Sequence, residues 1–142
     1  MREILLDLFK GKRIDNGEWV YGYYFYDKYY HKAYITLGNN VLKVSEENPN
    51  KRILEAFEVI PETVGRETGF KDKNGKKIFE GDILSFKNDD GEFSNYEVVY
   101  FGNRWGVIQN GSQFADELDI FFCERSAVIG NIHDNPELLK ES

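Results

Sequence analysis

The aromatic residues of this 142-residue chain fall in short runs, and Gly, Asn and Asp bound most of these runs. Phe, Trp and Tyr make up 15% of the chain, with 9 tyrosines and 11 phenylalanines. Aromatic side chains favour the pleated surface of a strand, whereas Gly, Asn and Asp favour the turns between strands. The sequence therefore predicts an all-β fold built from short strands and turns.

The first 60 residues predict an N-terminal β-meander. A polar connection at residues 10–17 is expected to join its first two strands, and residues 29–37 and 41–44 are expected to form a hairpin. Gly38, Asn39 and Asn40 between them tolerate positive φ, which supports that hairpin. Residues 52–60 fit a short helix or a strand equally well. The extended segments expected in this region are residues 4–9, 19–26, 29–37 and 41–44.

Residues 61–142 predict a small barrel, SH3-like or OB-like, with a sandwich as the alternative. A hairpin of residues 96–101 and 105–109 is expected, because Gly102-Asn103 lies between two apolar runs. Asn74-Gly75 is expected in a type I′ turn, and Asn135-Pro136-Glu137 is typical of a helix start. The extended segments expected here are residues 63–68, 77–79, 82–86, 96–101, 105–109, 120–122 and 127–132.

No long linker separates these regions, so residues 1–60 and 61–142 are expected to form one compact unit. The preferred fold is thus an N-terminal β-meander packed on a C-terminal SH3-like small barrel, closed by a short C-terminal helix. A chain of this length can bury enough apolar surface to fold without covalent staples.

The charge balance limits the partners of the chain. Eighteen basic and 25 acidic residues give a formal net charge of −7, which repels phosphate backbones and weighs against nucleic-acid binding. The lysines at 71–77 are interleaved with acidic side chains, which is typical of a solvated turn. The N-terminal apolar cluster is surrounded by charges, so neither a signal peptide nor a membrane span is expected, and the cytoplasm is the expected location.

The potential catalytic groups have plainer structural interpretations. Cys123 is the lone cysteine and, with His31 and His133, supplies too few ligands for a Cys/His zinc site. Glu80-Gly81-Asp82 is typical of a strand start, and Asp89, Asp90 and Glu92 surround a hairpin tip without the spacing of a calcium loop. His133-Asp134 belongs to a strand-to-helix junction. We therefore predict no catalytic residue, no metal, no cofactor and no enzymatic activity.

The tyrosines around residues 19–34 outnumber the rings that one face of a strand can bury. Alternation puts Trp19, Tyr21, Tyr23 and Phe25 on one face, and Val20, Tyr24 and Tyr26 on the other. Two-sided packing would absorb these rings, while an interaction surface would leave some of them exposed. Arg104 and Trp105 lie near a hairpin tip that could reach a partner. The candidate interaction residues are Tyr21, Tyr23, Tyr24, Tyr26, Arg104 and Trp105.

Residues 59–83 form the most specific block of the chain. They combine a Pro-Glu-Thr start, a Thr-Gly pair, a Lys-Asn-Gly turn and a Glu-Gly-Asp segment in that order. Together with residues 128–139 and with Trp19-Val20-Tyr21-Gly22, this block closely resembles the YopX-like family of phage and prophage proteins. The resemblance implies a small β-rich protein encoded in a phage or prophage genome, and it carries over no activity, cofactor or catalytic residue.

These observations leave several functions open. The leading hypothesis is a non-enzymatic module that binds a host or phage protein through an aromatic surface and an exposed barrel edge. A barrel that stacks single-stranded nucleic acid on its aromatic residues is the first alternative. An acidic decoy of a host nucleic-acid-binding enzyme is the second. Homo-oligomerisation stays open, and the sequence itself names no partner.

Overall fold

The computed structural model describes residues 8–37, 42–44, 52–54 and 56–140. The described residues form antiparallel strands with two short α-helices and one 3-10 helix, so the prediction of an all-β fold is confirmed. The chain divides into two compact units, an N-terminal unit of residues 1–66 and a C-terminal unit of residues 67–142. The expected packing of the meander on the barrel stays a prediction.

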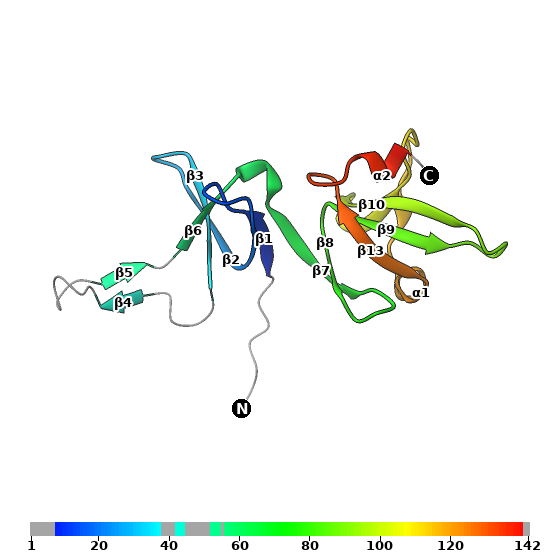
Figure 1. Ribbon diagram of the computed structural model, residues 1–142, viewed down its shortest axis with the longest axis horizontal. Coiled ribbons are helices and arrows are strands. Elements are labelled where there is room, and N and C mark those ends of the chain that lie inside the picture. Colours follow the sequence, from blue (N-terminus) through cyan, green and yellow to red (C-terminus); the bar gives the residue numbers. More distant parts are fainter. Residues whose placement is uncertain (1–7, 38–41, 45–51, 55, 141–142) are drawn as a thin grey trace, which may run out of the picture. The chain divides into compact units, whose positions relative to one another are not determined.

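The N-terminal unit is built on four antiparallel strands in the order β6-β3-β2-β1 (Figure 1). Its core contains the fully buried Ala33, Ile35 and Val59, against which Phe9, Val20, Tyr24 and Val64 pack. A separate pair, β4 with β5, precedes β6 along the chain. The elements are β1 (Phe9–Lys12), β2 (Trp19–Asp27), β3 (Lys32–Thr36), β4 (Leu42–Val44), β5 (Arg52–Leu54), β6 (Ala56–Val59) and the 3-10 helix η1 (Pro61–Thr63).

Two expectations for this unit are wrong. The hairpin of residues 29–37 with residues 41–44 does not form, because β3 pairs with β2 on one side and with β6 on the other. This double pairing buries Ala33 and Ile35 completely, which a two-stranded hairpin could not do. The polar connection at residues 10–17 is shorter than expected, because β1 continues to Lys12 and Gly11 lies directly against Val59.

The remaining expectations for the N-terminal unit have different outcomes. The strand expected at residues 19–26 is confirmed as β2. The ambiguous segment 52–60 contains strands β5 and β6 rather than a helix. Residues 4–7 and the turn at residues 38–40 lie outside the described residues.

The C-terminal unit is built on a five-stranded antiparallel sheet in the order β12-β11-β10-β9-β13, of which Figure 1 labels β9, β10 and β13. Its core contains the buried side chains of Ile78, Leu84, Val98, Val107, Leu118 and Cys123. Strand β7 starts with Gly65 and Arg66 paired to β1, and from Glu67 onward it pairs with β8. The elements are β7 (Gly65–Lys71), β8 (Lys77–Phe79), β9 (Asp82–Lys87), β10 (Phe93–Phe101), β11 (Arg104–Ile108), β12 (Asp116–Glu117), α1 (Ile120–Glu124), β13 (Ser126–Asn131) and α2 (Glu137–Lys140).

Most sequence expectations for this unit are confirmed, including the C-terminal helix, which is α2. The hairpin of β10 and β11 has the expected two-residue turn, in which Gly102 and Asn103 have φ values of 60° and 66°. Closure of the sheet into an SH3-like barrel stays a prediction.

The strand expected at residues 120–122 is wrong, since these residues start helix α1. The Asp119 carboxylate accepts a hydrogen bond from the backbone N–H of Phe122 at 2.9 Å, which is the geometry of a helix N-cap. The helical turn directs Phe122 onto the ring of Phe86, with the two centroids 4.4 Å apart. Helix formation therefore buries Cys123 and half-buries Phe122 and leaves Phe121 exposed.

The turn at residues 72–75 differs from the expected type I′ geometry. Gly75 has the positive φ of 80° that the turn prediction requires, whereas Asn74 is not among the described residues with positive φ. The Asp72 carboxylate explains the difference, because its Oδ1 accepts the backbone N–H groups of Asn74 and Lys76, each at 2.9 Å. The side chain of Asp72 thus organises the turn that the backbone alone would close in type I′ geometry.

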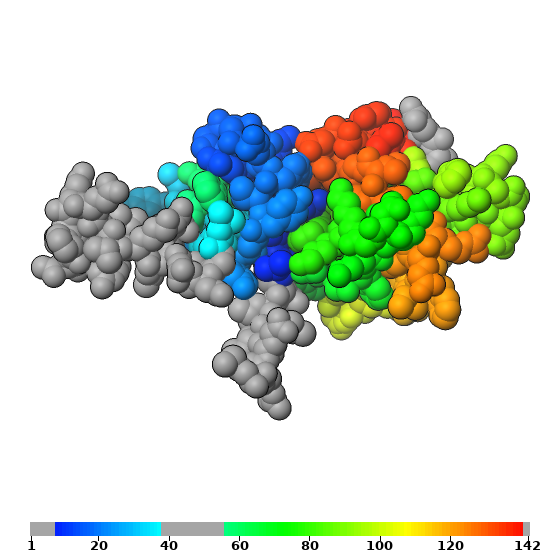
Figure 2. All heavy atoms as spheres, turned by 60° about the horizontal axis from the view of Figure 1, so that its bottom comes forward, coloured from blue at the N-terminus to red at the C-terminus, as the bar shows by residue number. Residues whose placement is uncertain are grey.

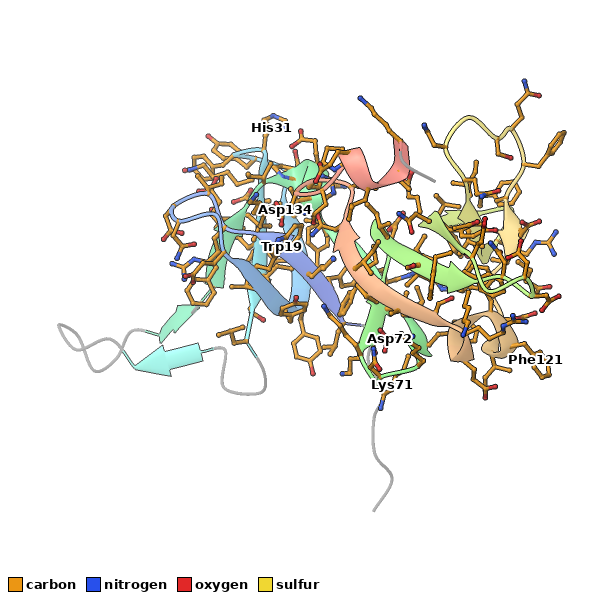
Figure 3. The ribbon with its side chains drawn as sticks, turned by 45° about the vertical axis from the view of Figure 1, so that its right-hand side comes forward. Trp19, His31, Lys71, Asp72, Phe121 and Asp134 are labelled. Atoms are coloured by element: carbon orange, nitrogen blue, oxygen red, sulfur yellow. The ribbon has the colours of Figure 1, made fainter. Side chains whose placement is uncertain are left out.

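Asp72 also links this turn to the last strand of the sheet. Its Oδ2 accepts the backbone N–H of Val128 at 2.9 Å, and the N–H of Lys73 donates to the carbonyl of Ser126 at 2.9 Å. In Figure 2 the green atoms of the β7–β8 hairpin lie against the orange atoms that lead from α1 into β13, and Figure 3 labels Asp72 in this hairpin. Asp72 therefore connects two segments 56 residues apart along the chain.

Candidate functional site

The predicted tyrosine surface is divided between the two faces of β2. Tyr24 packs on the core beside Phe9, with ring centroids 5.3 Å apart. Phe25, on the opposite face, stacks on Tyr34 of β3 at 5.0 Å. Tyr21 and Tyr26 are exposed, Tyr23 and Tyr24 are half-buried, and alternation puts Tyr21 and Tyr26 on opposite faces. The structure therefore does not bring these four tyrosines together on one surface.

Two further tyrosines are displayed on the turn that joins β2 to β3. Tyr29 and Tyr30 are 83% and 66% exposed, and their rings meet edge to face with centroids 4.7 Å apart. Asp27 Oδ1 accepts the backbone N–H groups of both residues, which fixes the turn, and His31 follows with a φ of 55°. Figure 3 labels His31 on this turn. The sequence predicted a strand from residue 29 to residue 37, whereas β3 starts at Lys32, so the exposed turn that carries Tyr29 and Tyr30 was not predicted.

A small cleft lies beside the β10–β11 hairpin of the C-terminal unit and is called here the hairpin pocket. It has a volume of about 170 Å³. Two of its residues, Arg104 and Trp105, are candidate interaction residues from the sequence. The lining residues are Phe101, Arg104, Trp105, Gly106, Ala115, Asp116 and Glu117.

The tight turn at Gly102-Asn103 sets the positions of the aromatic residues near the hairpin pocket. Strand register sets Phe101 opposite Arg104, and Tyr100 opposite Trp105, with the last two rings 4.9 Å apart. Phe101 is 51% exposed, so much of its ring is open to solvent. Because the turn has only two residues, these side chains are held by the ladder of the hairpin rather than by a long loop.

Strand β12 forms the acidic wall, and a glycine allows its close approach. A Cβ at Gly106 would lie 2.9 Å from the carbonyl oxygen of Asp116, so any larger residue would push β12 away. The backbone N–H of Leu118 donates to the carbonyl of Trp105 at 3.1 Å and holds the same segment. These contacts hold Asp116 and Glu117 against β11 at the edge of the hairpin pocket.

The hairpin pocket is lined by charged residues of both signs. Two carboxylates and one guanidinium line it, which gives a formal charge of −1. Burial, together with the negative charge of Asp116, raises the pKa of the half-buried Tyr96. Within the described part of the chain, the guanidinium of Arg104 makes no ion pair at 4.0 Å or less with either carboxylate of the pocket. The two carboxylates are exposed.

The carboxylates singled out in the sequence have structural roles. The buried Asp82 accepts the backbone N–H of Phe79 through Oδ2 at 2.8 Å, beside the positive φ of Gly81. At the β9–β10 tip, Asp89 forms an ion pair with Arg125 at 3.0 Å, and Asp90 accepts the N–H of Glu92 at 2.9 Å. These hydrogen bonds and ion pairs are those of turns and hairpin tips.

Cys123 and the His133-Asp134 pair also lie in structural settings. Cys123 is buried in the core, and desolvation together with neighbouring carboxylates raises the pKa of its thiol to about 11. The N–H groups of His133 and Asp134 both donate to Asn131 Oδ1 at 2.9 Å, which forms the turn after β13. Among the described residues, no group of three or more His, Cys, Asp or Glu side chains could hold a metal ion.

Comparison with known proteins gives a family and a similar structure. A family model described as "YopX protein" matches residues 9–140. A solved structure described as "Crystal structure of protein EF1440 from Enterococcus faecalis" is similar, with 26% sequence identity and a TM-score of 0.59. The match covers 96% of this chain and 99% of that chain. No curated protein matches, and no helix in the described residues is long and apolar enough to cross a membrane.

Proposed function

The chain belongs to the YopX protein family, and we propose that it is a phage- or prophage-encoded protein that acts in the bacterial cytoplasm by binding another protein, without catalysis. The observation that carries this proposal is the exposed aromatic surface of the β10–β11 hairpin. Phe101, which lines the hairpin pocket, and its neighbour Tyr100 are both exposed at this hairpin. Aromatic side chains are enriched at protein interfaces, because they contribute large contact areas at low entropic cost.

The roles of the titratable side chains support binding over catalysis. Asp72, Asp82 and Asp119 each accept backbone N–H groups in turns or at a helix start. The pKa of Cys123 is raised rather than lowered, so its thiol is a poor nucleophile near neutral pH. A catalytic site would instead need an accessible group whose pKa is tuned toward the working pH.

The strand order of the C-terminal unit supports an SH3-like interpretation. If the five strands of the sheet are numbered along the chain from β9 as the first to β13 as the fifth, their order across the sheet is 5-1-2-3-4. SH3-like barrels have the same order, with a short helical turn between the fourth and fifth strands, where this chain has α1. Modules of this kind bind peptide segments in grooves lined with aromatic side chains.

The edges of the sheet favour the aromatic surface over strand addition. Strand β12 has only two residues, and the pairing of β13 with β9 shifts register between Val128 and Gly130. Short and bulged edge strands are poor templates for an added strand. The proposed partner therefore binds the side chains of the hairpin rather than the backbone of an edge.

An affinity capture with matched variants tests this function. The full chain, carrying a photo-crosslinker at Asn103, is produced in the bacterial host during phage induction, and captured proteins are identified by mass spectrometry. Phe101→Ser is expected to remove the specific partner. Phe121→Ser on α1, an exposed position that Figure 3 labels, is expected to retain it. Identical capture by both variants, or capture equal to a chain without crosslinker, contradicts the proposal.

Single-stranded nucleic acid is a second candidate, because Trp105 and Arg104 lie together at an exposed hairpin and could stack on bases. The two carboxylates of the hairpin pocket and the net charge of −7 weigh against it. Backbone contacts are strongest where screening is weakest. No binding of single-stranded DNA or RNA at about 50 mM salt is therefore the expected result, and salt-sensitive binding that Trp105→Ala removes would favour the alternative.

A further inference from the structure

The charges of the chain are divided unevenly between its two units. Residues 67–142 contain 8 basic and 15 acidic side chains, a difference of −7 that accounts for the whole formal net charge. Residues 1–66 contain 10 basic and 10 acidic side chains, so the N-terminal unit is formally neutral. The net charge of the N-terminal unit therefore does not repel an acidic partner, whereas that of the C-terminal unit does.

One exposed turn of the neutral unit combines cations with aromatic rings. Residues 28–32, called here the tyrosine turn, connect β2 to β3, and all of them are exposed. The adjacent Asp27 is half-buried, and its Oδ1 accepts the backbone N–H groups of Tyr29 at 2.9 Å and of Tyr30 at 3.2 Å. The Asp27 carboxylate is thus engaged within the turn, while the residues of the tyrosine turn itself are two lysines, two tyrosines and one histidine.

The two lysines of the tyrosine turn differ in their ion pairs. The Lys32 Nζ lies 3.8 Å from a carboxylate oxygen of Glu58, and both side chains are partly exposed. Among the residues that the structure describes, Lys28 makes no ion pair. The ammonium group of Lys28 is therefore available to a carboxylate from another molecule.

The two rings of the tyrosine turn form a small, preorganised contact surface. Tyr29 is 83% exposed and Tyr30 is 66% exposed, and their edge-to-face contact holds the centroids 4.7 Å apart. A tyrosine buries about 150–250 Å² in a contact, so the pair covers less than the roughly 800 Å² per partner of a stable interface. The size of this surface suits a short peptide segment rather than a second folded copy of the chain.

We propose that the tyrosine turn binds a short acidic segment of a protein partner. Its carboxylates would lie on the ammonium groups of Lys28 and Lys32, and an apolar side chain between them would pack on the two rings. This surface belongs to the N-terminal unit and is additional to the β10–β11 hairpin on which the proposed function rests.

Single-stranded nucleic acid fits the tyrosine turn less well than an acidic peptide does. Such a strand needs a basic groove that follows several phosphates, and ring faces on which successive bases stack. The tyrosine turn supplies two lysines, one of which already has Glu58 as a partner, and its rings meet edge to face. A short acidic segment needs only one or two carboxylates beside an apolar side chain.

The test is an NMR titration of the full-length, nitrogen-15-labelled protein at about 50 mM salt. The probes are blocked pentapeptides with leucine at the second and fourth positions and with aspartate, asparagine or lysine at the other three, together with a short oligothymidylate. We expect saturable shifts of the backbone amides of Lys28, Tyr29 and Tyr30 with the aspartate peptide, and these shifts should weaken as salt is added. Equal shifts with the asparagine peptide, larger shifts with the lysine peptide or the oligothymidylate, or no shifts with any probe overturn the proposal.

Matched variants separate this turn from general charge attraction. Lys28→Gln is expected to weaken binding of the aspartate peptide by about two- to fivefold, the range for exposed ion pairs. The double variant Tyr29→Ser, Tyr30→Ser is expected to remove saturable binding, read at the Lys28 amide. The controls Tyr21→Ser, at an exposed tyrosine outside the turn, and Lys73→Gln, at an exposed lysine of the C-terminal unit, should leave binding unchanged. Equal weakening by Lys28→Gln and Lys73→Gln would refute a specific site.

This proposal and the proposed function fail separately. The peptide titration reads amides of the N-terminal unit, whereas the capture experiment depends on Phe101 of the C-terminal unit. A negative titration rejects the acidic segment and leaves capture through Phe101 intact, and a negative capture leaves peptide binding at the tyrosine turn intact.

Discussion

Replacing Asp72 by Ala removes the carboxylate that joins the β7–β8 turn to β13. The three backbone N–H groups of Asn74, Lys76 and Val128 lose their acceptor. A hydrogen bond to a charged group contributes about 1.5–3 kcal/mol. The two turn donors can rehydrate, because Asn74 and Lys76 are exposed, so we assign about 0.5–1 kcal/mol to each. The half-buried Val128 keeps the full value, and Asp72→Ala should cost about 2.5–5 kcal/mol.

The assay is urea unfolding followed by the fluorescence of Trp105, which lies in the same unit, in a Trp19→Phe background. Asp90→Ala is the matched control, because Asp90 also accepts a turn N–H at 2.9 Å but is exposed. It should cost less than about 1 kcal/mol. If both variants shift the free energy of unfolding equally, the long-range bond to Val128 contributes nothing and the reasoning is refuted.

The same carboxylate predicts a dependence of stability on pH. Burial by itself raises the pKa of Asp72, but the backbone N–H groups of Val128, Lys76 and Asn74 outweigh it and lower the pKa below the ordinary 3.8. A pKa lowered by folding gives a stabilisation that is complete above the ordinary value and is lost as the pH falls through the folded value. The stability difference between wild type and Asp72→Ala should therefore shrink below about pH 4. A difference that stays constant in acid would contradict the assignment.

Three further predictions concern the same unit. Gly75→Val should lower the free energy of unfolding, measured by heat or urea, by about 1–3 kcal/mol. Gly75 has a φ of 80° and no atom lies within 4 Å of an added Cβ, so this cost is backbone strain. Asp90→Val should cost far less, and an unchanged midpoint for Gly75→Val would exclude the left-handed conformation. Cys123 should react with iodoacetamide far more slowly in the native protein than in urea at pH 8, because its raised pKa of about 11 and its burial suppress the thiolate; equal rates by mass spectrometry would contradict this. Asp119→Ala should cost about 0.5–2 kcal/mol through loss of the α1 cap, whereas Asp119→Asn should retain most of the stability, and equal losses would argue against a cap.

The turn of the β10–β11 hairpin was predictable from the sequence, because its conformation depends on two adjacent residues. Gly102-Asn103 indicated a two-residue hairpin, and the φ values of both residues agree with it. Helix α1 was missed because three apolar residues in a row fit a strand and a helix equally. The signal that could have separated them is Asp119, an N-cap residue directly before the apolar run.

Pairing between distant segments was not predictable in the same way. The sequence placed residues 29–37 beside residues 41–44, whereas β3 pairs with β6, in which the partner of Ala33 is Val59 and the partner of Thr36 is Ala56. The acidic wall of the hairpin pocket has the same origin. No residue adjacent to Asp116 indicates that its backbone packs against Gly106. This close approach depends on the missing side chain of Gly106, which lies ten residues earlier in the chain. Contacts of this kind are decided by tertiary packing rather than by local preference.

The position of β13 in the sheet has a consequence for biosynthesis. Strand β9 is the first strand of the five-stranded sheet to be translated, and β13 is the last, yet Leu84 pairs with Val128. While a ribosome extends the chain from β9 through α1, one side of β9 therefore has no partner. Unpaired strand edges are prone to pair with other chains. The nascent C-terminal unit thus passes through a period of vulnerability to misassembly that ends only when β13 emerges and Asp72 acquires its third hydrogen bond.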